Sequence, residues 1–587
     1  MINDNKSQKG FSSFFIAQWK KIKNVFHQVT AKEMLVYCIA IVAMIAALWP
    51  MLAQGVTLND ELQNRFDRKI GFWTLVVENT KVHFDKGRVL SLIVDWRYLG
   101  FLSENMFFNR CICAMLIVLN AALLARVLYR VCKDKHFSLL TGFLFVVLMP
   151  LTFQHAAPAA FTPLVAVPML FLSISLLYYM TFLEQELHQK KNAIISAIFF
   201  FLAICGYEFV IVYALLFPLL YIYYGIREKR SFRFFDIVKS CVWHIAAGVL
   251  FLVLYFGLAL LFPTGYTGNQ IGFVSLSSSF EIIKTLFLSA IPGYYCFNGV
   301  SKYQMQIYNG GLLNAQSLLS LGVFFIVIGA AICIFYFASQ QTKAKNSWWS
   351  AVTLALCLIY MVLPSLPNAV SLMYQGTVNS ESFTSLPVSY FLYGAAIIFI
   401  AQLLWLLKNL FHKTKVIGAI AVCLCVMCVL IPQQALNHVV GRVQAEDYQR
   451  LQMIEGVFET KTMKACHNKT VYSKNIYQTR NLLAIHDGYW ERYAALYDIN
   501  VDFVDEMTEP SKPLMALNVQ DKSVVLWSAS DGLCYVFAEE LLDETYCLVD
   551  GEGFAYCLPR VSPGNDADYY LYTFQWNVID RTIMPIS

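Results

Sequence analysis

The sequence is poor in charge and rich in apolar residues, which excludes several classes of protein. Charged residues make up 14% of the 587 residues and hydrophobic ones 58%, whereas a typical soluble domain has about 25% and about 45–50%. A cytosolic enzyme, a disordered scaffold and a nucleic-acid-binding protein are therefore excluded. The chain also contains no phosphate-binding loop, no dinucleotide fingerprint and no His-Glu-x-x-His, so ATP-driven transport and zinc proteolysis have no support.

Long apolar runs fill the first three quarters of the chain. A helix needs roughly 20 residues to cross about 30 Å of hydrocarbon. We expect eleven spans, near residues 34–54, 106–131, 137–155, 161–183, 193–206, 208–225, 240–262, 316–338, 348–365, 386–407 and 416–432. The fifth and sixth runs are short, so they form either one broken span or a tight helical hairpin. We favour the hairpin, because both flanking segments are basic and a hairpin returns them to the same side.

The distribution of Lys and Arg orients these spans. Short cytoplasmic loops carry an excess of both residues, and here the N-terminal arm and every second connection are basic. The residues are Lys6, Lys9, Lys20, Lys21, Lys23, Arg130, Lys133, Lys135, Lys190, Lys191, Arg227, Lys229, Arg230, Arg233, Lys343, Lys345, Lys408, Lys413 and Lys415. This alternation predicts a cytoplasmic N-terminal arm, residues 1–33, a transmembrane domain, 34–432, and an extracytoplasmic tail, 433–587.

The tail differs abruptly in composition from the rest of the chain. It has charged and turn-forming residues throughout, with strand-like stretches at 469–473, 523–527 and 569–573. These features predict a small mixed α/β domain. The expected fold is thus an all-α membrane bundle of about eleven helices with a small extracytoplasmic α/β domain at its C-terminal end.

Two cysteines of the tail are spaced as the arms of a hairpin. Cys547 and Cys557 flank Asp550-Gly551-Glu552-Gly553, and a three-residue loop with Gly553 in the left-handed position would place them opposite each other. Side chains opposed across two antiparallel strands are about as far apart as a disulfide requires. The alternative is that both are reduced and buried.

The first loop between spans, residues 55–105, is the richest in charge. Asp60 and Glu61 follow the first span by a few residues, and Gly87-Arg88 precedes the second span. A carboxylate at the membrane surface is partly shielded from water, which raises its affinity for a proton or a metal and suits a general base. The alternative is that an outer loop must be polar and that these charges are solvated.

These residues resemble the motifs of a known enzyme family. An acidic pair after the first span and a Gly-Arg ahead of the second are similar to those of integral-membrane glycosyltransferases of the C superfamily, which take sugars from a polyprenyl-phosphate carrier. Asn59-Asp60-Glu61 with Gly87-Arg88-Val89-Leu90 is most similar to the bacterial O-antigen glucosyltransferases of serotype conversion. Gly206-Tyr207-Glu208 followed by Tyr213 resembles their aromatic-polar motif in a later span, with Glu208 where an amide is expected. The matching motifs lie in roughly the first 230 residues.

The resemblance implies transfer of a hexose, in this family glucose, from a polyprenyl-phosphate donor to a surface glycan or a lipid-linked acceptor. Asp60 would be the base that deprotonates the acceptor hydroxyl. Glu61 would assist it, or the two would hold a divalent metal such as Mg²⁺ or Mn²⁺. Arg88 would bind the departing phosphate through a bidentate contact. Arg97 is a further candidate; for it and Arg110 we favour the alternative, which is anchoring to lipid headgroups.

Glu208, Tyr207, Tyr374 and Gln375 are candidates on later segments. Glu208 is an ionisable residue within an apolar segment, where a charge is costly and therefore usually paired and functional; the alternative is a capping residue in a tight turn. Tyr207 adjoins it. Tyr374 and Gln375 precede the tenth span and can contact a sugar by stacking and amide hydrogen bonds, or belong to the interfacial aromatic belt.

Two other classes of function stay open. A flippase or transporter of lipid-linked glycans should carry mid-membrane charges and two related halves, whereas here the charges cluster at the outer ends of spans. A ligase or polymerase of surface polysaccharide should centre on a large loop between late spans, whereas the acidic pair lies in the first loop. We therefore expect a multi-pass plasma-membrane enzyme that interacts with the bilayer, a lipid-linked sugar donor and a glycan acceptor.

Overall fold

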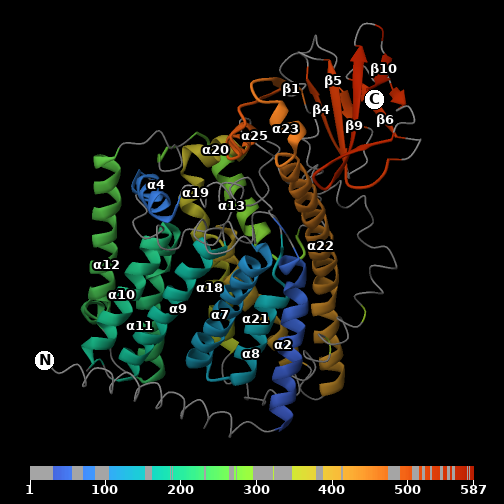
Figure 1. The fold of residues 1–587 in the computed structure, drawn as a ribbon. Helices are drawn as coiled ribbons and strands as arrows, with labels where there is room; N and C mark the ends of the chain where they lie inside the picture. The colour runs from blue at the N-terminus through green and yellow to red at the C-terminus, as the bar shows by residue number, and fades with distance from the viewer. Residues whose placement is uncertain are drawn as a thin grey trace, which may run out of the picture.

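The protein consists of a bundle of long helices and a C-terminal sheet, which one long helix joins in the computed structural model (Figure 1). Among the described residues, seven helices are long and apolar enough to cross a membrane, and two shorter apolar ones accompany them. The expected membrane bundle is confirmed, while the number eleven stays a prediction. The structure describes residues 31–53, 55, 71–85, 105–151, 162–185, 187, 189–229, 233–262, 270–272, 274–294, 322, 329, 347–378, 388–410, 414–472, 489–504, 515–517, 523–528, 532–542, 546–550, 555–557, 562–577, 580 and 582–586.

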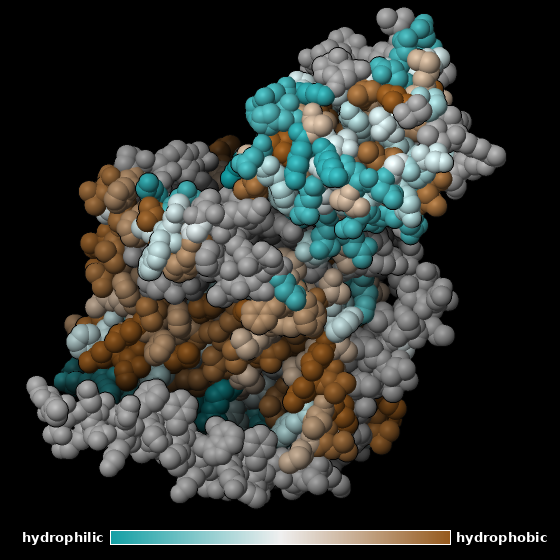
Figure 2. Space-filling view, in the orientation of Figure 1, coloured by the Kyte–Doolittle hydropathy of each residue, from teal (hydrophilic) through white to brown (hydrophobic). Residues whose placement is uncertain are grey.

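Helices occupy the expected apolar runs, apart from run 316–338, of which only Gly322 and Gly329 are described. They are α2 (Ala31–Leu52), α7 (Met106–Cys132), α8 (Lys135–Val147), α9 (Thr162–Glu184), α10 (Lys190–Gly206), α11 (Leu216–Arg227), α12 (Phe234–Leu261), α18 (Ser347–Tyr360), α21 (Ser389–Leu410) and α22 (Lys415–Val457). Shorter helices lie between them: α4 (Phe72–Asp85), η1 (Glu208–Leu215), α13 (Leu276–Ser289), η3 (Leu363–Ser365), α19 (Leu366–Ala369) and α20 (Leu372–Val378). Apolar side chains cover the surface of the bundle in Figure 2, and α12 exposes many of them.

The fifth and sixth runs form a helical hairpin, as predicted. The helix breaks at Tyr207, whose backbone is extended with φ −153° and ψ 120°. The rings of Phe200 and Phe217 then pack with their centroids 5.1 Å apart. A continuous helix would separate these two residues by about 25 Å, because each residue adds a rise of 1.5 Å. Glu208 therefore lies at the turn of the hairpin, as expected for the first residue of the sixth run.

Basic connections gather at one end of the bundle, which we call the basic end. Arg130 at the end of α7 forms an ion pair with Glu184 at the end of α9, and donates to Thr181 Oγ1 at 2.7 Å. The Lys133 ammonium lies 3.4 Å from Glu184, and the Tyr224 hydroxyl of α11 donates to the same carboxylate at 3.1 Å. The ends of three helices are thus joined around one carboxylate, and the predicted common side of these loops is confirmed.

At the opposite end, which we call the sheet end, α22 does not stop near residue 432. It continues through Pro432 to Val457, so that one helix carries the chain from the bundle to the sheet (Figure 1). Three fully buried amides of this helix, Gln433, Gln434 and Asn437, bind backbone groups at the end of α8, just beyond it and in the segment after α13. Their partners are Val147 O at 2.7 Å, Met149 O and Leu151 N at 2.9 Å, and Gly293 N at 2.8 Å.

The tail contains two sheets. The larger sheet has the strand order β10-β9-β5-β4-β1-β2, and β8 pairs with β9. Its strands are β1 (Thr470–Tyr472), β2 (Asp502–Val504), β4 (Ser523–Ser528), β5 (Leu533–Ala538), β8 (Gly564–Asp566), β9 (Tyr569–Asn577) and β10 (Thr582–Pro585). Strands β3 (Met515–Leu517), β6 (Cys547–Asp550) and β7 (Ala555–Cys557) form the smaller one. The helices α23 (Lys461–Ala465) and α25 (Tyr489–Ala495) complete the mixed domain. All three predicted strands are present, as β1, β4 and β9.

The predicted hairpin of Cys547 and Cys557 has the expected register, since the two residues are paired across antiparallel strands β6 and β7.

If the tail lies outside the cytoplasm, we expect a disulfide between Cys547 and Cys557 in the isolated protein. Mass spectrometry of peptides prepared without reduction would detect the linked pair, and Cys547→Ser would serve as the control. Modification of both thiols by an impermeant reagent on sealed cells before reduction would contradict the disulfide.

Asp566 of β8 connects the sheet to the first turn of α23, the short helix that follows α22. Its carboxylate accepts hydrogen bonds from the backbone N–H groups of Lys461 and Thr462, at 3.0 and 2.8 Å, and from the Thr462 hydroxyl at 2.6 Å. Burial alone would raise the pKa of Asp566, but these hydrogen bonds outweigh it and hold the pKa below its usual value. The ionised carboxylate therefore stabilises the fold above the ordinary carboxyl pKa, and this contribution is lost as the pH falls through the lowered value.

We expect Asp566→Asn to lower the free energy of unfolding at pH 7 by about 1 kcal/mol, the usual effect of losing a helix cap. The difference from the wild type should shrink as the pH falls below the ordinary carboxyl pKa and through the lowered pKa of Asp566. Thermal unfolding followed by tryptophan fluorescence would measure it. Asp568→Asn, at a neighbouring exposed carboxylate, is the control; an equal effect there would contradict the assignment.

Candidate functional site

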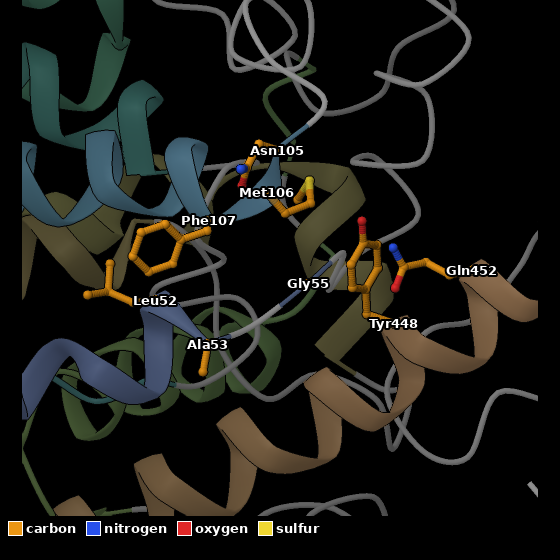
Figure 3. Close-up of a pocket in the computed structure, with 8 residues that line it drawn as sticks. All are labelled: Leu52, Ala53, Gly55, Asn105, Met106, Phe107, Tyr448 and Gln452. Atoms are coloured by element: carbon orange, nitrogen blue, oxygen red, sulfur yellow. The ribbon is translucent and has the colours of Figure 1, made fainter.

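A cavity of about 540 Å³ lies at the sheet end of the bundle (Figure 3). This volume falls within the range of about 300–1,000 Å³ typical of ligand sites. Its walls come from the end of α2, the first turn of α7 and one face of α22. The lining residues are Leu52, Ala53, Gly55, Asn105, Met106, Phe107, Tyr448 and Gln452.

The first loop leaves and rejoins the bundle at this cavity. Gly55 and Asn105, both in its wall, are the residues at which that loop begins and ends. Asp60 and Glu61 follow Gly55 by five and six residues, and Arg97 precedes Asn105 by eight. Asp60, Glu61, Arg88 and Arg97 all lie outside the described residues, so their predicted roles stay predictions. The two ends of the loop that carries these four residues, Gly55 and Asn105, lie in the cavity wall.

Arg110, one turn into α7, is hydrogen-bonded to Gly55, a residue of the cavity wall. Its side chain is 0% exposed, and its guanidinium Nη2 donates a hydrogen bond to the carbonyl of Gly55. Anchoring to lipid headgroups, which we favoured for this residue, is therefore wrong, because the group lies inside the protein. A buried guanidinium is costly unless it is paired, and here it holds the start of the loop against α7.

The wall formed by α22 is polar and closely fitted. Tyr448 and Gln452 lie one turn apart and face Gly55 (Figure 3). A Cβ atom at Gly55 would overlap the ring of Tyr448, so only glycine allows this approach. Gln444, one turn earlier, is 1% exposed, and neither its amide oxygen nor its amide nitrogen has a hydrogen-bond partner. The helix thus presents three polar side chains at intervals of four residues, which places them on one face.

The Gly206-Tyr207-Glu208 motif lies elsewhere on the bundle. Tyr207 is buried against Phe391 of α21, with ring centroids 5.4 Å apart. The Tyr213 hydroxyl donates to the carbonyl of the same Phe391 at 2.6 Å. Glu208 is half-buried and begins η1. Neither Tyr207 nor Glu208 lines the cavity, so the structure does not bring this motif to the ends of the first loop.

Gln375 has a structural function that the sequence did not indicate. It is fully buried; its amide oxygen accepts from Val274 N at 2.7 Å, and its amide nitrogen donates to Gly272 O at 2.8 Å. The amide therefore makes the two backbone hydrogen bonds, to Val274 and Gly272, that a neighbouring strand would otherwise make to the segment before α13. Because both ends of the amide are engaged by backbone, we revise its predicted contact with a sugar. Tyr374 is half-buried against the bundle core.

No cluster of three or more metal-ligating side chains occurs among the described residues. The predicted divalent-metal ligands Asp60 and Glu61 are not among them, so that prediction stands as it was made. The first residues of α7 form part of the cavity wall, and the N-terminal end of a helix favours negative charge.

No protein-family model, curated protein or solved structure matches this chain. The resemblance to glycosyltransferases therefore has its support in the short motifs of the first 230 residues. Gln444, Tyr448 and Gln452 were not predicted as site residues, because the last span was expected to end at residue 432. A signal was present nonetheless, since polar residues recur there at intervals of four along an uninterrupted helix.

We expect Arg110→Leu to lower the free energy of unfolding by about 1.5–3 kcal/mol, the typical contribution of a hydrogen bond to a charged group. Thermal unfolding of the purified protein would measure the change. Arg126→Leu is the matched control, because Arg126 lies on the same helix with an exposed side chain over the ring of Tyr129. A surface substitution of this kind changes stability by about 0.5 kcal/mol or less. Equal changes in the two variants would contradict a structural bond to Gly55.

Proposed function

We propose that the protein is a membrane glycosyltransferase that transfers a hexose, glucose by the resemblance, from a polyprenyl-phosphate carrier to a surface glycan or a lipid-linked acceptor. One observation carries the proposal: the charged first loop begins and ends at a cavity, and the wall residue Gly55 at its start accepts a hydrogen bond from the buried Arg110. Donor phosphate and catalytic carboxylates are the groups that such an arrangement would bring together.

In this proposal the acceptor hydroxyl attacks the anomeric carbon of the donor sugar. The bond from that carbon to the phosphate oxygen breaks, polyprenyl phosphate leaves, and Asp60 takes the proton of the hydroxyl. Glu61 assists, or shares a Mg²⁺ or Mn²⁺ ion with Asp60. Arg88 binds the leaving phosphate as a bidentate partner, with Arg97 as a further candidate. Arg110 and the first turn of α7 add a positive potential at the same place.

The proposed orientation puts the basic end in the cytoplasm and the sheet end outside. The excess of Lys and Arg in the short loops of the basic end supports it, since such loops remain cytoplasmic. The cavity and the tail domain then share the outer face, where a surface glycan is assembled. The N-terminal arm lies on the cytoplasmic side, and eleven spans connect the two faces.

Asp60→Asn is expected to reduce sugar transfer on the order of 10²–10⁴-fold, because an amide of the same shape cannot accept the proton. Membranes supplied with a panel of polyprenyl-phosphate sugars would be assayed for the glycosylated acceptor and for released polyprenyl phosphate. Glu61→Gln should have a smaller effect unless the two carboxylates share a metal. Asp67→Asn, in the same loop, is the control.

Near-full turnover in Asp60→Asn would exclude Asp60 as the base. The assay also separates enzyme from flippase, because a flippase moves the donor across the bilayer without cleaving its sugar–phosphate bond. Movement of intact donor with no release of polyprenyl phosphate would overturn the proposed function.

A further inference from the structure

The helix α4 of the first loop lies beside the membrane-spanning helix α12 (Figure 1). Each residue of an α-helix is rotated by about 100° from the one before it, and on this basis the described side chains of α4 divide into three faces. Leu75, Asn79 and His83 form the inner face, with exposed fractions of 0%, 0% and 9%. This face packs α4 against the rest of the protein.

The second face of α4 is apolar and exposed. It holds Trp73, Val77 and Phe84, which lie within about 40° of one another around the helix axis. Trp73 is 77% exposed and Val77 is 54% exposed. Thr80 borders this face, and its hydroxyl donates to the carbonyl of Val76 at 2.6 Å. The hydroxyl therefore has an acceptor within its own helix, as a polar group next to lipid requires.

The third face of α4 is polar. Thr74, Glu78 and Lys81 lie on it, and all three are exposed. The centre of this face is about 90° around the axis from the centre of the apolar face. Adjoining apolar and polar faces are typical of an interfacial helix, whose apolar side lies in lipid and whose polar side faces headgroups and water.

The contact with α12 determines the depth of α4 in the membrane. With 28 residues, α12 is about 42 Å long, close to the thickness of a bilayer together with its headgroups. Phe84 packs on Phe262 at the C-terminal end of α12, with ring centroids 6.2 Å apart. Leu260 and Leu261, just before it, are 83% and 74% exposed. The apolar face of α4 therefore continues the lipid-facing surface of α12 at the boundary between hydrocarbon and headgroups.

We propose that α4 is embedded in the lipid leaflet at the C-terminal end of α12, with Trp73 and Val77 among the acyl chains and Glu78 toward the headgroups. Removing the apolar face from water is favourable, and an indole ring is suited to the interface because it is both apolar and a hydrogen-bond donor. The charges of Glu78 and Lys81 cancel, so a neutral phospholipid is a sufficient partner. The helix thereby attaches the first loop to the membrane. The inference is independent of the proposed glycosyltransferase activity.

The test compares neighbouring positions on the two exposed faces. p-Benzoylphenylalanine, whose photoexcited ketone reacts with nearby C–H bonds, would replace Trp73 or Val77 on the apolar face and Thr74 or Glu78 on the polar face. The positions within each pair, 73 with 74 and 77 with 78, differ by one residue and by about 100° around the axis. All four side chains are exposed, so the probe displaces no core contact. The full chain in phosphatidylcholine nanodiscs would be irradiated, and lipid-modified α4 peptides would be quantified by mass spectrometry.

We expect a lipid adduct at positions 73 and 77 and its loss at positions 74 and 78. Equal yields of adduct within the pairs would overturn the proposal, since α4 would then turn no particular side toward lipid. A covalent dimer, or a link to another segment of the same chain, in place of the lipid adduct at position 73 would overturn it as well, because protein would then cover the apolar face. The two pairs report separately, so a variant that fails to fold leaves the other pair to decide.

Discussion

The structure depends on a rule of the lipid interior, that every backbone N–H and C=O group must find a partner within the protein. The rule is most demanding where a helix ends early. The helix α8 stops at Val147, and the chain beyond it still lies in the bundle core. Gln433, Gln434 and Asn437 of α22 supply the partners there and at Gly293. These amides connect three segments distant in sequence, and so determine where α22 can pass.

The path of α22 in turn shapes the cavity of the first loop. A Cβ atom at Gly441 would lie 2.7 Å from the carbonyl oxygen of Pro50, so the two helices touch backbone to backbone just before α2 ends. Two turns later Tyr448 covers Gly55, and Gln452 continues the wall. The same helix leads into the tail domain, where Asp566 binds the first two residues of the next helix, α23. A single continuous element therefore sets both the site and the position of the sheet above it.

Two buried polar side chains of the bundle, Arg110 and His244, differ in the contacts that they make. Arg110 is permanently charged, and its guanidinium donates a hydrogen bond to the carbonyl of Gly55 at the start of the first loop. His244 stacks on Phe217, and its Nε2 lies 2.8 Å from Ser196 Oγ. Arg110 thus joins α7 to the start of the first loop, whereas His244 joins α12 to α10 and α11.

The sequence by itself determined the helical spans, the hairpin at Tyr207, three strands and the register of Cys547 with Cys557. Each follows from a local pattern, namely hydropathy over about 20 residues, paired basic flanks or alternation along a strand. Only the tertiary structure decided that Arg110 is buried, that Gln375 binds backbone groups and that α22 continues beyond the membrane span predicted at 416–432. A side chain's burial and partners depend on residues brought close from distant parts of the chain, as Gln434 is to Val147, and no local pattern records those neighbours.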